Sequence, residues 1–519
     1  MPIVSVTPPG FERYGLPKSV SLAHGGASCN PVAESRGLRT HICFSYIESF
    51  QLESGVELTD VTVAYKTWGK LNANGDNCLI ICHALSGSSD VEDWWGPLLG
   101  YGKAFDTSRF FVFCANVLGS PYGTTSPLSR NPKTGRLYGP EFPQTSVRDD
   151  VRLHKLVLDA LGVTSVAAVV GGSMGGFLTL EWPLCFPGYI KNIVPISTSV
   201  NHDAWGIAWA EAQRQCVFAD PAYQDGYYHP TPATQPASGL AAARMVAMLT
   251  YRSSPSFHAR FGRSPAAKDG RKPKSPNSVP NSIPNGVPNG VPNGAPNDVP
   301  NGVPNGVPND APTDVPNGVT NGVTNGVAQD NLLPQPAPLD TRRDSKISEE
   351  AKVVEGKAVR PTFTAQSYLQ YQGQKFVGRF DANCFIHLTR KMDHHDLTRG
   401  RIKEQQGDGV QDSSDDALLS QVLSIVPPKS LVVGITSDVL FTPEQQDVLA
   451  RNLPEASLVM IPSAQGHDGF LLEFETLGPL IDGHLRERCP WVYEGPPLVV
   501  EDSRKVVKDS LFGEVESGW

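Results

Sequence analysis

Residues 166–182 have the sequence VAAVVGGSMGGFLTLEW, and this stretch decides the fold. An apolar run leads into two glycines, then Ser173, and a second apolar run follows two more glycines. This order predicts a buried strand, a sharp turn and a helix, with Ser173 at the turn. Gly171 and Gly175 lack the Cβ that would block the close approach of strand and helix. The serine hydroxyl is then exposed at a helix N-terminus, which suits a nucleophile that passes through an oxyanion.

Two later segments supply the partners that such a serine needs. The apolar run at 431–436 is followed by Asp438, and the run at 458–461 is followed by His467. The chain order Ser173, Asp438, His467 is that of the α/β-hydrolase fold, with acid and base each on a loop after a strand. We predict that Ser173 is the nucleophile, that His467 is its base and that Asp438 orients the imidazole.

An oxyanion needs two backbone N–H donors. The amide after the nucleophile belongs to Met174, and the second donor comes from the loop after an earlier strand. That loop is HALSG at 83–87, where Leu85 is the best candidate. His83 closes an apolar run, so we expect it to be structural and not a rival base.

The remaining pattern indicates an α/β fold with a mostly parallel, doubly wound sheet. Residues 147–161 carry apolar side chains at helical spacing, and 50–53 with 61–65 predict a hairpin. The other strands are expected within 78–85, 110–116, 166–170, 190–196, 431–436 and 458–461.

Between the strand at 190–196 and the strand at 431–436, the pattern changes to helices interrupted by a repeat. The motif Pro-Asn-Gly-Val recurs from about 275 to 327; its prolines block helices, and its few valines cannot form a core. We therefore predict a helical lid with a disordered insert. The expected parts are an irregular arm at 1–45, the core at 46–199 and 427–490, the lid at 200–263 and 361–426, the insert at 264–360 and a tail at 491–519.

Composition narrows the possible partners and compartment. The formal net charge is −9 and no basic stripe appears, so we expect no nucleic-acid partner. No apolar run approaches the roughly 20 residues of a membrane span, and no secretory signal is evident. The nine cysteines form no C-x-x-C pair, which favours reduced thiols in the cytoplasm and no metal site, although organelle import stays open. His394 and His395 are adjacent and would point apart on a helix, which argues against a metal there too.

These residues predict acyl transfer by a serine nucleophile, but they do not choose between water and another acceptor. A longer set of motifs bears on that choice. They are AYKTWG at 64–69, CHALSGS at 82–88, DWWGPL at 93–98, GSPYG at 119–123, VRDDVR at 147–152, EAQRQ at 211–215, LTYR at 249–252, RFDANC at 379–384 and GHD at 466–468.

Through these motifs the chain resembles the homoserine O-acetyltransferases, particularly the fungal ones, over about 48–263 and 362–515. The resemblance implies that acetyl-CoA acylates Ser173 and that L-homoserine then takes the acetyl group by ping-pong kinetics, in methionine biosynthesis. Acetyl-CoA would be a co-substrate, with no prosthetic group and no metal, and a homodimer would be common in such a family.

The resemblance also implies two substrate-binding residues. Arg244 would hold the carboxylate of the amino acid and Asp468 its ammonium group, with Arg214 as the fallback for the carboxylate. Structural roles compete: Arg244 could form a salt bridge within the lid, and Asp468 could cap a helix. The chain departs from the family pattern at Phe177, where methionine is more usual, which could reshape the wall near the acyl group.

Other functions stay open on the sequence. The acceptor could be L-serine or a deacetylcephalosporin, and the donor could be succinyl-CoA. An esterase or thioesterase would use water, and a non-catalytic scaffold would use the repeat for binding.

Overall fold

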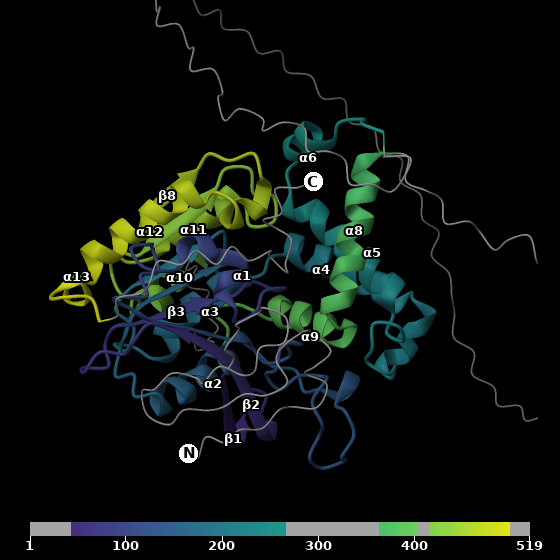
Figure 1. Ribbon diagram of the computed structural model, residues 1–519, viewed down its shortest axis with the longest axis horizontal. Coiled ribbons are helices and arrows are strands. Elements are labelled where there is room, and N and C mark those ends of the chain that lie inside the picture. The colour runs from purple at the N-terminus through teal and green to yellow at the C-terminus, as the bar shows by residue number, and fades with distance from the viewer. Residues whose placement is uncertain (1–42, 266–362, 402–414, 499–519) are drawn as a thin grey trace, which may run out of the picture. The chain divides into compact units, whose positions relative to one another are not determined.

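The computed structural model describes residues 43–265, 363–401 and 415–498 (Figure 1). The chain divides into two units, Met1–Lys274 with Pro361–Trp519, and Ser275–Arg360. The second unit, which contains the Pro-Asn-Gly-Val repeat, lies outside the described residues, as do nearly all of the predicted arm and most of the tail.

Eight strands of the described residues form one sheet in the order β1-β2-β4-β3-β5-β6-β7-β8. The pairs β1–β2 and β2–β4 are antiparallel, and all other neighbours are parallel, which confirms the predicted fold class. The strands are β1 (Cys43–Gln51), β2 (Glu57–Trp68), β3 (Cys78–Cys82), β4 (Phe111–Ala115), β5 (Val166–Gly172), β6 (Ile193–Ile196), β7 (Leu431–Ile435) and β8 (Ser457–Ile461).

The first hairpin differs from the prediction. Strand β1 ends at Gln51, earlier than expected, because Leu52 and Gly55 form the turn: the Gly55 N–H donates to the Leu52 carbonyl at 2.9 Å. The strand instead extends back to Cys43, inside the predicted arm. Cys43 is disulfide-bonded, which corrects the expectation of reduced cysteines, whereas the seven other described cysteines are free thiols.

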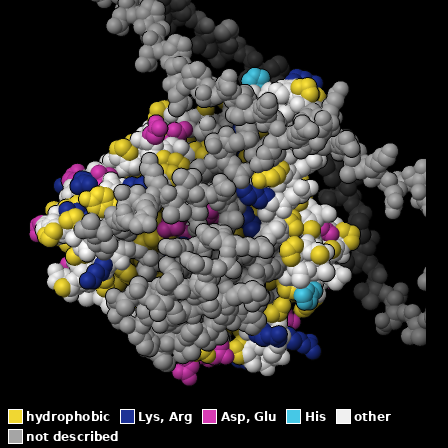
Figure 2. Space-filling view, in the orientation of Figure 1, with side chains coloured by type: hydrophobic (Ala, Val, Ile, Leu, Met, Phe, Trp, Pro, Cys, Tyr) yellow, Lys and Arg dark blue, Asp and Glu magenta, His cyan; other side chains and the backbone are white. Residues whose placement is uncertain are grey.

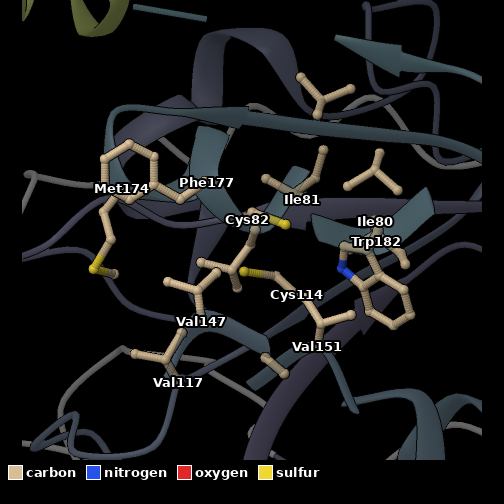
Figure 3. Packing of buried hydrophobic residues seen from close by; sticks show 14 of the residues in the cluster. Ile80, Ile81, Cys82, Cys114, Val117, Val147, Val151, Met174, Phe177 and Trp182 are labelled. Carbon is tan, nitrogen blue, oxygen red and sulfur yellow. The ribbon is translucent and has the colours of Figure 1, made fainter. Parts of the chain in front are cut away.

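The central strands are buried along their whole length, as continuous apolar runs require. Figure 3 shows the side chains of Cys82 and Cys114 among Val147 and Val151 of a helix that covers the sheet. That helix, α2 (Val147–Ala160), starts at a capping box in which Ser146 and Asp149 satisfy each other's backbone N–H groups. The other helices of this part are α1 (Val91–Trp95), α3 (Met174–Cys185), α10 (Asp415–Leu423), α11 (Pro443–Asn452), α12 (Phe474–Arg488) and α13 (Pro490–Tyr493), with short 3₁₀ helices η2 (Gly96–Leu98), η3 (Gly139–Glu141) and η6 (Gly466–Leu471).

A second group of helices is inserted between β6 and β7. Helices α4, α5 and α8 lie side by side in it (Figure 1). The group consists of α4 (Ala204–Phe218), η4 (Pro221–Gly226), α5 (Ala237–Tyr251), α6 (Ser254–Phe261), α8 (Thr364–Arg379) and α9 (Ala382–Asp393). Lys391 of α9 joins it to the core, since its Nζ lies 2.6 Å from the buried Asp150 carboxylate of α2.

The strand order creates a switch point beside β3, because the chain passes from β3 to β4 on one side and to β5 on the other. Ligands of open α/β sheets bind at the carboxyl ends of strands at such a point. Both the loop that begins at His83 and the turn at Ser173 lie there, after β3 and β5.

Candidate active site

Ser173 adopts a left-handed backbone conformation, with φ 59° and ψ −127°. The surrounding glycines allow it: a Cβ on Gly171 would lie 2.3 Å from the Gly175 carbonyl oxygen, and one on Gly175 would lie 2.1 Å from that of Cys82. The Ser173 N–H donates to Ile196 O at 3.0 Å, which fixes the turn to the next strand. The predicted elbow is therefore present, and its strain is concentrated at the serine.

The acid and the base meet across the ends of β7 and β8. His467 Nδ1 lies 2.8 Å from Asp438 Oδ2. The other carboxylate oxygen accepts the backbone N–H groups of Leu440 and Phe441, both at 2.9 Å. These bonds hold Asp438 as an acceptor, so Nδ1 of the imidazole carries the proton and Nε2 is left as the basic nitrogen.

Aromatic rings enclose the imidazole. The ring centroids of Phe470, Phe441 and Tyr251 lie 5.2, 5.3 and 6.0 Å from that of His467. Phe470 also packs beside the elbow, since a Cβ on Gly172 would lie 2.5 Å from its ring. The histidine loop is thereby held against the strand end that carries Ser173, and all three predicted triad residues are buried.

The loop after β3 is a tight turn in which the Gly87 N–H donates to Ala84 O at 2.9 Å, with Leu85 at a central position. His83 supports it: Nδ1 contacts Ala84 O at 2.8 Å, and Nε2 accepts the Val117 N–H at 3.3 Å. Burial lowers the pKa of His83 to about 4, so the ring is neutral. These contacts give His83 the expected structural role beneath the predicted oxyanion donor.

Arg244 lies on α5 and is 2% exposed. Its guanidinium Cζ lies 5.3 Å from the centroid of Tyr251 and 5.0 Å from that of Phe376. Because Tyr251 also contacts His467, the ring of Tyr251 connects the Arg244 cation with the imidazole. This location is consistent with the predicted binding of a substrate carboxylate.

Asp468 forms an ion pair that sequence reasoning missed. Its Oδ2 lies 2.8 Å from Nε of Arg252. Asp468 does not cap the short helix η6, because it lies inside that helix, whose N-cap is Gln465. Arg252 Nη1 also donates to Gln465 Oε1 at 2.8 Å. The motif LTYR contains Arg252, but nothing in the sequence pairs it with the distant histidine loop.

The charges of Arg244, Arg252 and Asp468 converge on Tyr368 of α8. Burial raises the pKa of its phenol; among the charges, Asp468 raises this pKa, and Arg252 and Arg244 lower it. Arg244 contacts the ring of Tyr251, Tyr251 contacts His467, and Asp468 follows His467 in the chain, so the two predicted substrate-binding residues lie in the same region.

Arg214, the fallback for the carboxylate, lies on α4 and is paired with two acidic side chains. Its Nη2 contacts Glu211 at 2.8 Å and Asp393 at 2.7 Å.

The departure from the family pattern at Phe177 has a local explanation, because its ring stacks on that of His395 with centroids 4.0 Å apart. Among the described residues, His394 and His395 belong to no group of three or more His, Cys, Asp and Glu that could hold a metal ion.

Comparison with known proteins places these features in a family. Residues 77–291 match the model of the alpha/beta hydrolase fold. The chain is 48% identical to the homoserine O-acetyltransferase of Cryptococcus neoformans over 91% of this chain and 94% of the relative. That of Saccharomyces cerevisiae is also 48% identical, over 90% of this chain and 91% of the relative. The chain belongs to the homoserine O-acetyltransferase family.

Solved structures share the fold at lower identity. The homoserine O-acetyltransferase of Bacillus anthracis has a TM-score of 0.58 at 19% identity, covering 88% of this chain and 98% of that one. An acetylester hydrolase of Corynebacterium glutamicum has a TM-score of 0.56 at 20% identity, covering 86% and 95%. Transferases and an ester hydrolase thus share this architecture, and the fold of the family does not itself select the acceptor.

Proposed function

We propose that this protein transfers the acetyl group of acetyl-CoA to the γ-hydroxyl of L-homoserine, giving O-acetyl-L-homoserine and CoA. The observation that carries the proposal is the buried His467–Asp438 pair, held against a glycine elbow in a chain 48% identical to a fungal homoserine O-acetyltransferase. The groups around that pair have a separate role in each half-reaction.

In the first half-reaction, Ser173 Oγ attacks the thioester carbonyl while His467 Nε2 accepts the hydroxyl proton. The developing oxyanion is stabilised by the N–H groups of Met174 and Leu85. The C–S bond then breaks, CoA leaves as its thiol with the proton from His467, and an acetyl ester remains on Ser173. Asp438 stabilises the imidazolium formed during the transfer.

In the second half-reaction, the acceptor hydroxyl gives its proton to His467 Nε2 and attacks the acetyl ester. The ester bond to Ser173 breaks, and the serine oxygen recovers the proton. Water would compete for the same ester, so the enclosure of His467 by Tyr251, Phe441 and Phe470 favours the bound acceptor over hydrolysis.

The acceptor is recognised by its two charges. Arg244 binds the carboxylate through a planar pair of N–H donors, and Asp468 binds the ammonium group. Arg252 does not prevent this, because a carboxylate accepts several hydrogen bonds. The two opposite charges at one site favour a zwitterionic amino acid over a neutral alcohol.

The proposal extends to donor, partners and compartment. Acetyl-CoA acts as a co-substrate, with no prosthetic group, in methionine biosynthesis in the cytoplasm, and the enzyme acts as a homodimer. Neither nucleic acid nor membrane is a partner. On the described part of the face in Figure 2, Lys and Arg are interspersed with Asp and Glu, which supports the absence of a nucleic-acid partner. No described helix is long and apolar enough to cross a bilayer.

Free-thiol release from acetyl-CoA tests the proposal, measured with L-homoserine, L-serine or no acceptor, beside Ser173→Ala. We expect release that requires L-homoserine, yields its O-acetyl ester and is lost in the variant. Equal release without an acceptor would identify a thioesterase, and preference for L-serine would overturn the acceptor. Succinyl-CoA in place of acetyl-CoA tests the donor, and sedimentation tests the dimer.

A further inference from the structure

The turn after β3 is held at two carbonyl groups, one bonded within the turn and one bonded by the inserted helices. Ala84 O receives the Gly87 N–H at 2.9 Å and contacts His83 Nδ1 at 2.8 Å. Ser86 O receives a hydrogen bond from Arg379 Nη1 at 3.0 Å. Ser86 O belongs to the Ser86–Gly87 peptide unit, whose N–H donates to Ala84 O, and Ala84 O belongs to the peptide unit that carries the Leu85 N–H.

Arg379 comes from the inserted helices, not from the sheet. It is the last residue of α8, and the same Nη1 also donates to the hydroxyl of Tyr122 at 3.1 Å. The guanidinium Cζ lies 5.2 Å from the ring of Phe376, the ring that Arg244 contacts at 5.0 Å. Phe376 of α8 thus packs against both Arg244, the proposed carboxylate-binding residue, and Arg379, which bonds to the turn.

We infer that Arg379 is a positioning residue for the oxyanion hole: it holds the Ser86–Gly87 peptide unit, whose N–H in turn orients the Ala84–Leu85 peptide unit and with it the Leu85 N–H. The inference rests on the proposed acyl transfer through Ser173. Oxyanion donors act by being oriented before charge develops, and an N–H that must reorient during the reaction stabilises less. His83 fixes one end of the turn from the core, and Arg379 fixes the other from the lid.

A positioning role predicts an unusual kinetic pattern. Both half-reactions pass through a tetrahedral oxyanion, so loss of Arg379 slows acylation and deacylation by a similar factor. Because Arg379 acts through the turn, we expect a fall in kcat of about 10- to 100-fold, smaller than the 10²–10³ measured for loss of a donor itself. The KM for L-homoserine should change little, whereas a substitution of Arg244, the proposed carboxylate-binding residue, should raise it.

The experiment uses the full chain with Arg379→Lys, Arg379→Ala and the control Lys375→Ala, which removes a cation from the same helix. Acylation is followed by the burst of p-nitrophenol from p-nitrophenyl acetate, and deacylation by the L-homoserine dependence of turnover. We expect both rates to fall in Arg379→Ala and to recover in part when guanidinium is added. Lys375→Ala should match the wild type. The rates of Arg379→Lys should lie between those of Arg379→Ala and the wild type.

Several outcomes would overturn the inference. Wild-type rates in Arg379→Ala would do so, as would a slowing of only one half-reaction or a rise in KM alone. If Arg379→Ala fails to fold, Arg379→Lys decides the matter: equal slowing of both steps supports the role, and unchanged rates reject it. A wild-type protein without any acyl-serine burst would instead reject the proposed function, a result that the Arg379 variants cannot produce.

Discussion

Arg252 and Asp468 form an ion pair from which solvent is nearly excluded, with side chains 6% and 3% exposed and Nε 2.8 Å from Oδ2. The pair joins the chain between α5 and α6 to the loop of His467. Ser253 strengthens this link by donating its hydroxyl to Ala464 O. A residue proposed to bind substrate ammonium is therefore also a structural anchor, and its substitution should have two separable effects.

We predict that Asp468→Asn lowers the free energy of unfolding by about 3–5 kcal/mol, because it leaves the Arg252 cation buried without its counterion. It should also raise the KM for L-homoserine at least about tenfold, since one charged contact is lost. Urea unfolding measures the first effect and initial rates measure the second. The variant Arg252→Gln serves as control: it breaks the same pair but keeps the carboxylate. If it raises the KM as much as Asp468→Asn does, direct contact of Asp468 with the substrate is ruled out.

Asp438 offers a sharper test of the acid–base pair. In Asp438→Asn one of the two carboxylate acceptors becomes an amide donor, and the two N–H groups of Leu440 and Phe441 still need the remaining oxygen. The amide then faces His467 Nδ1 and favours the tautomer with its proton on Nε2, which cannot accept from Ser173. We predict a fall in kcat of about 10⁴-fold. Circular dichroism checks the fold, and a fall below tenfold with an intact fold would contradict the assigned role.

The glycines of the elbow lead to a purely steric prediction. A Cβ on Gly175 would lie 2.1 Å from the carbonyl oxygen of Cys82, a backbone atom that cannot move aside without displacing β3. Gly175→Ala should therefore separate α3 from β3, lower stability by more than about 2 kcal/mol and abolish activity. Gly483→Ala is the matched control, because it lies in α12 with no atom within 4 Å of the new Cβ. There we expect a gain of up to about 1 kcal/mol; equal melting temperatures for the two variants would contradict the steric account.

The sequence predicted much of this arrangement because its signals are local. Strand β5, the turn at Ser173 and the start of α3 follow from contiguous residues whose apolar runs and glycines have a direct steric meaning. The neighbourhood of Asp468 could not be predicted in the same way. Its partner Arg252 lies far away in the chain, and only the packing of the inserted helices against the histidine loop brings the two charges together.

Resemblance gave Arg244 and Asp468 their substrate-binding roles without placing them relative to each other, and the structure shows that both charges act on the phenol of Tyr368. The same reasoning put Arg244 first for the carboxylate and kept Arg214 as the fallback. What separates them is tertiary: Arg214 is held between Glu211 and Asp393, whereas Arg244 lies over Tyr251 next to His467. The roles of Ser173, Asp438 and His467 themselves remain predictions for the experiments above.

His83 gives a prediction for stability against pH. Burial lowers its pKa from 6.5 to about 4 in the folded protein, so the unfolded chain binds more protons between those values. The contribution of His83 to stability is therefore complete above pH 6.5 and is lost progressively as the pH falls toward 4. Its largest change is about 3 kcal/mol.

The variant His83→Asn removes this titration while its amide can still donate to Ala84 O. We expect it to be less stable than the wild type near neutrality, because Val117 N–H loses its acceptor, and the difference should narrow by about 3 kcal/mol as the pH falls to about 4. Taking the difference between two proteins removes most of the contribution of His154, whose pKa is lowered to about 3 chiefly by burial and only to a lesser extent by His83. His394→Asn, at an exposed site, should run parallel to the wild type in urea unfolding. A constant gap between His83→Asn and the wild type across this range would mean that His83 takes up its proton in the folded protein at the same pH as in the unfolded chain, and the buried, neutral His83 beneath Leu85 would have to be abandoned.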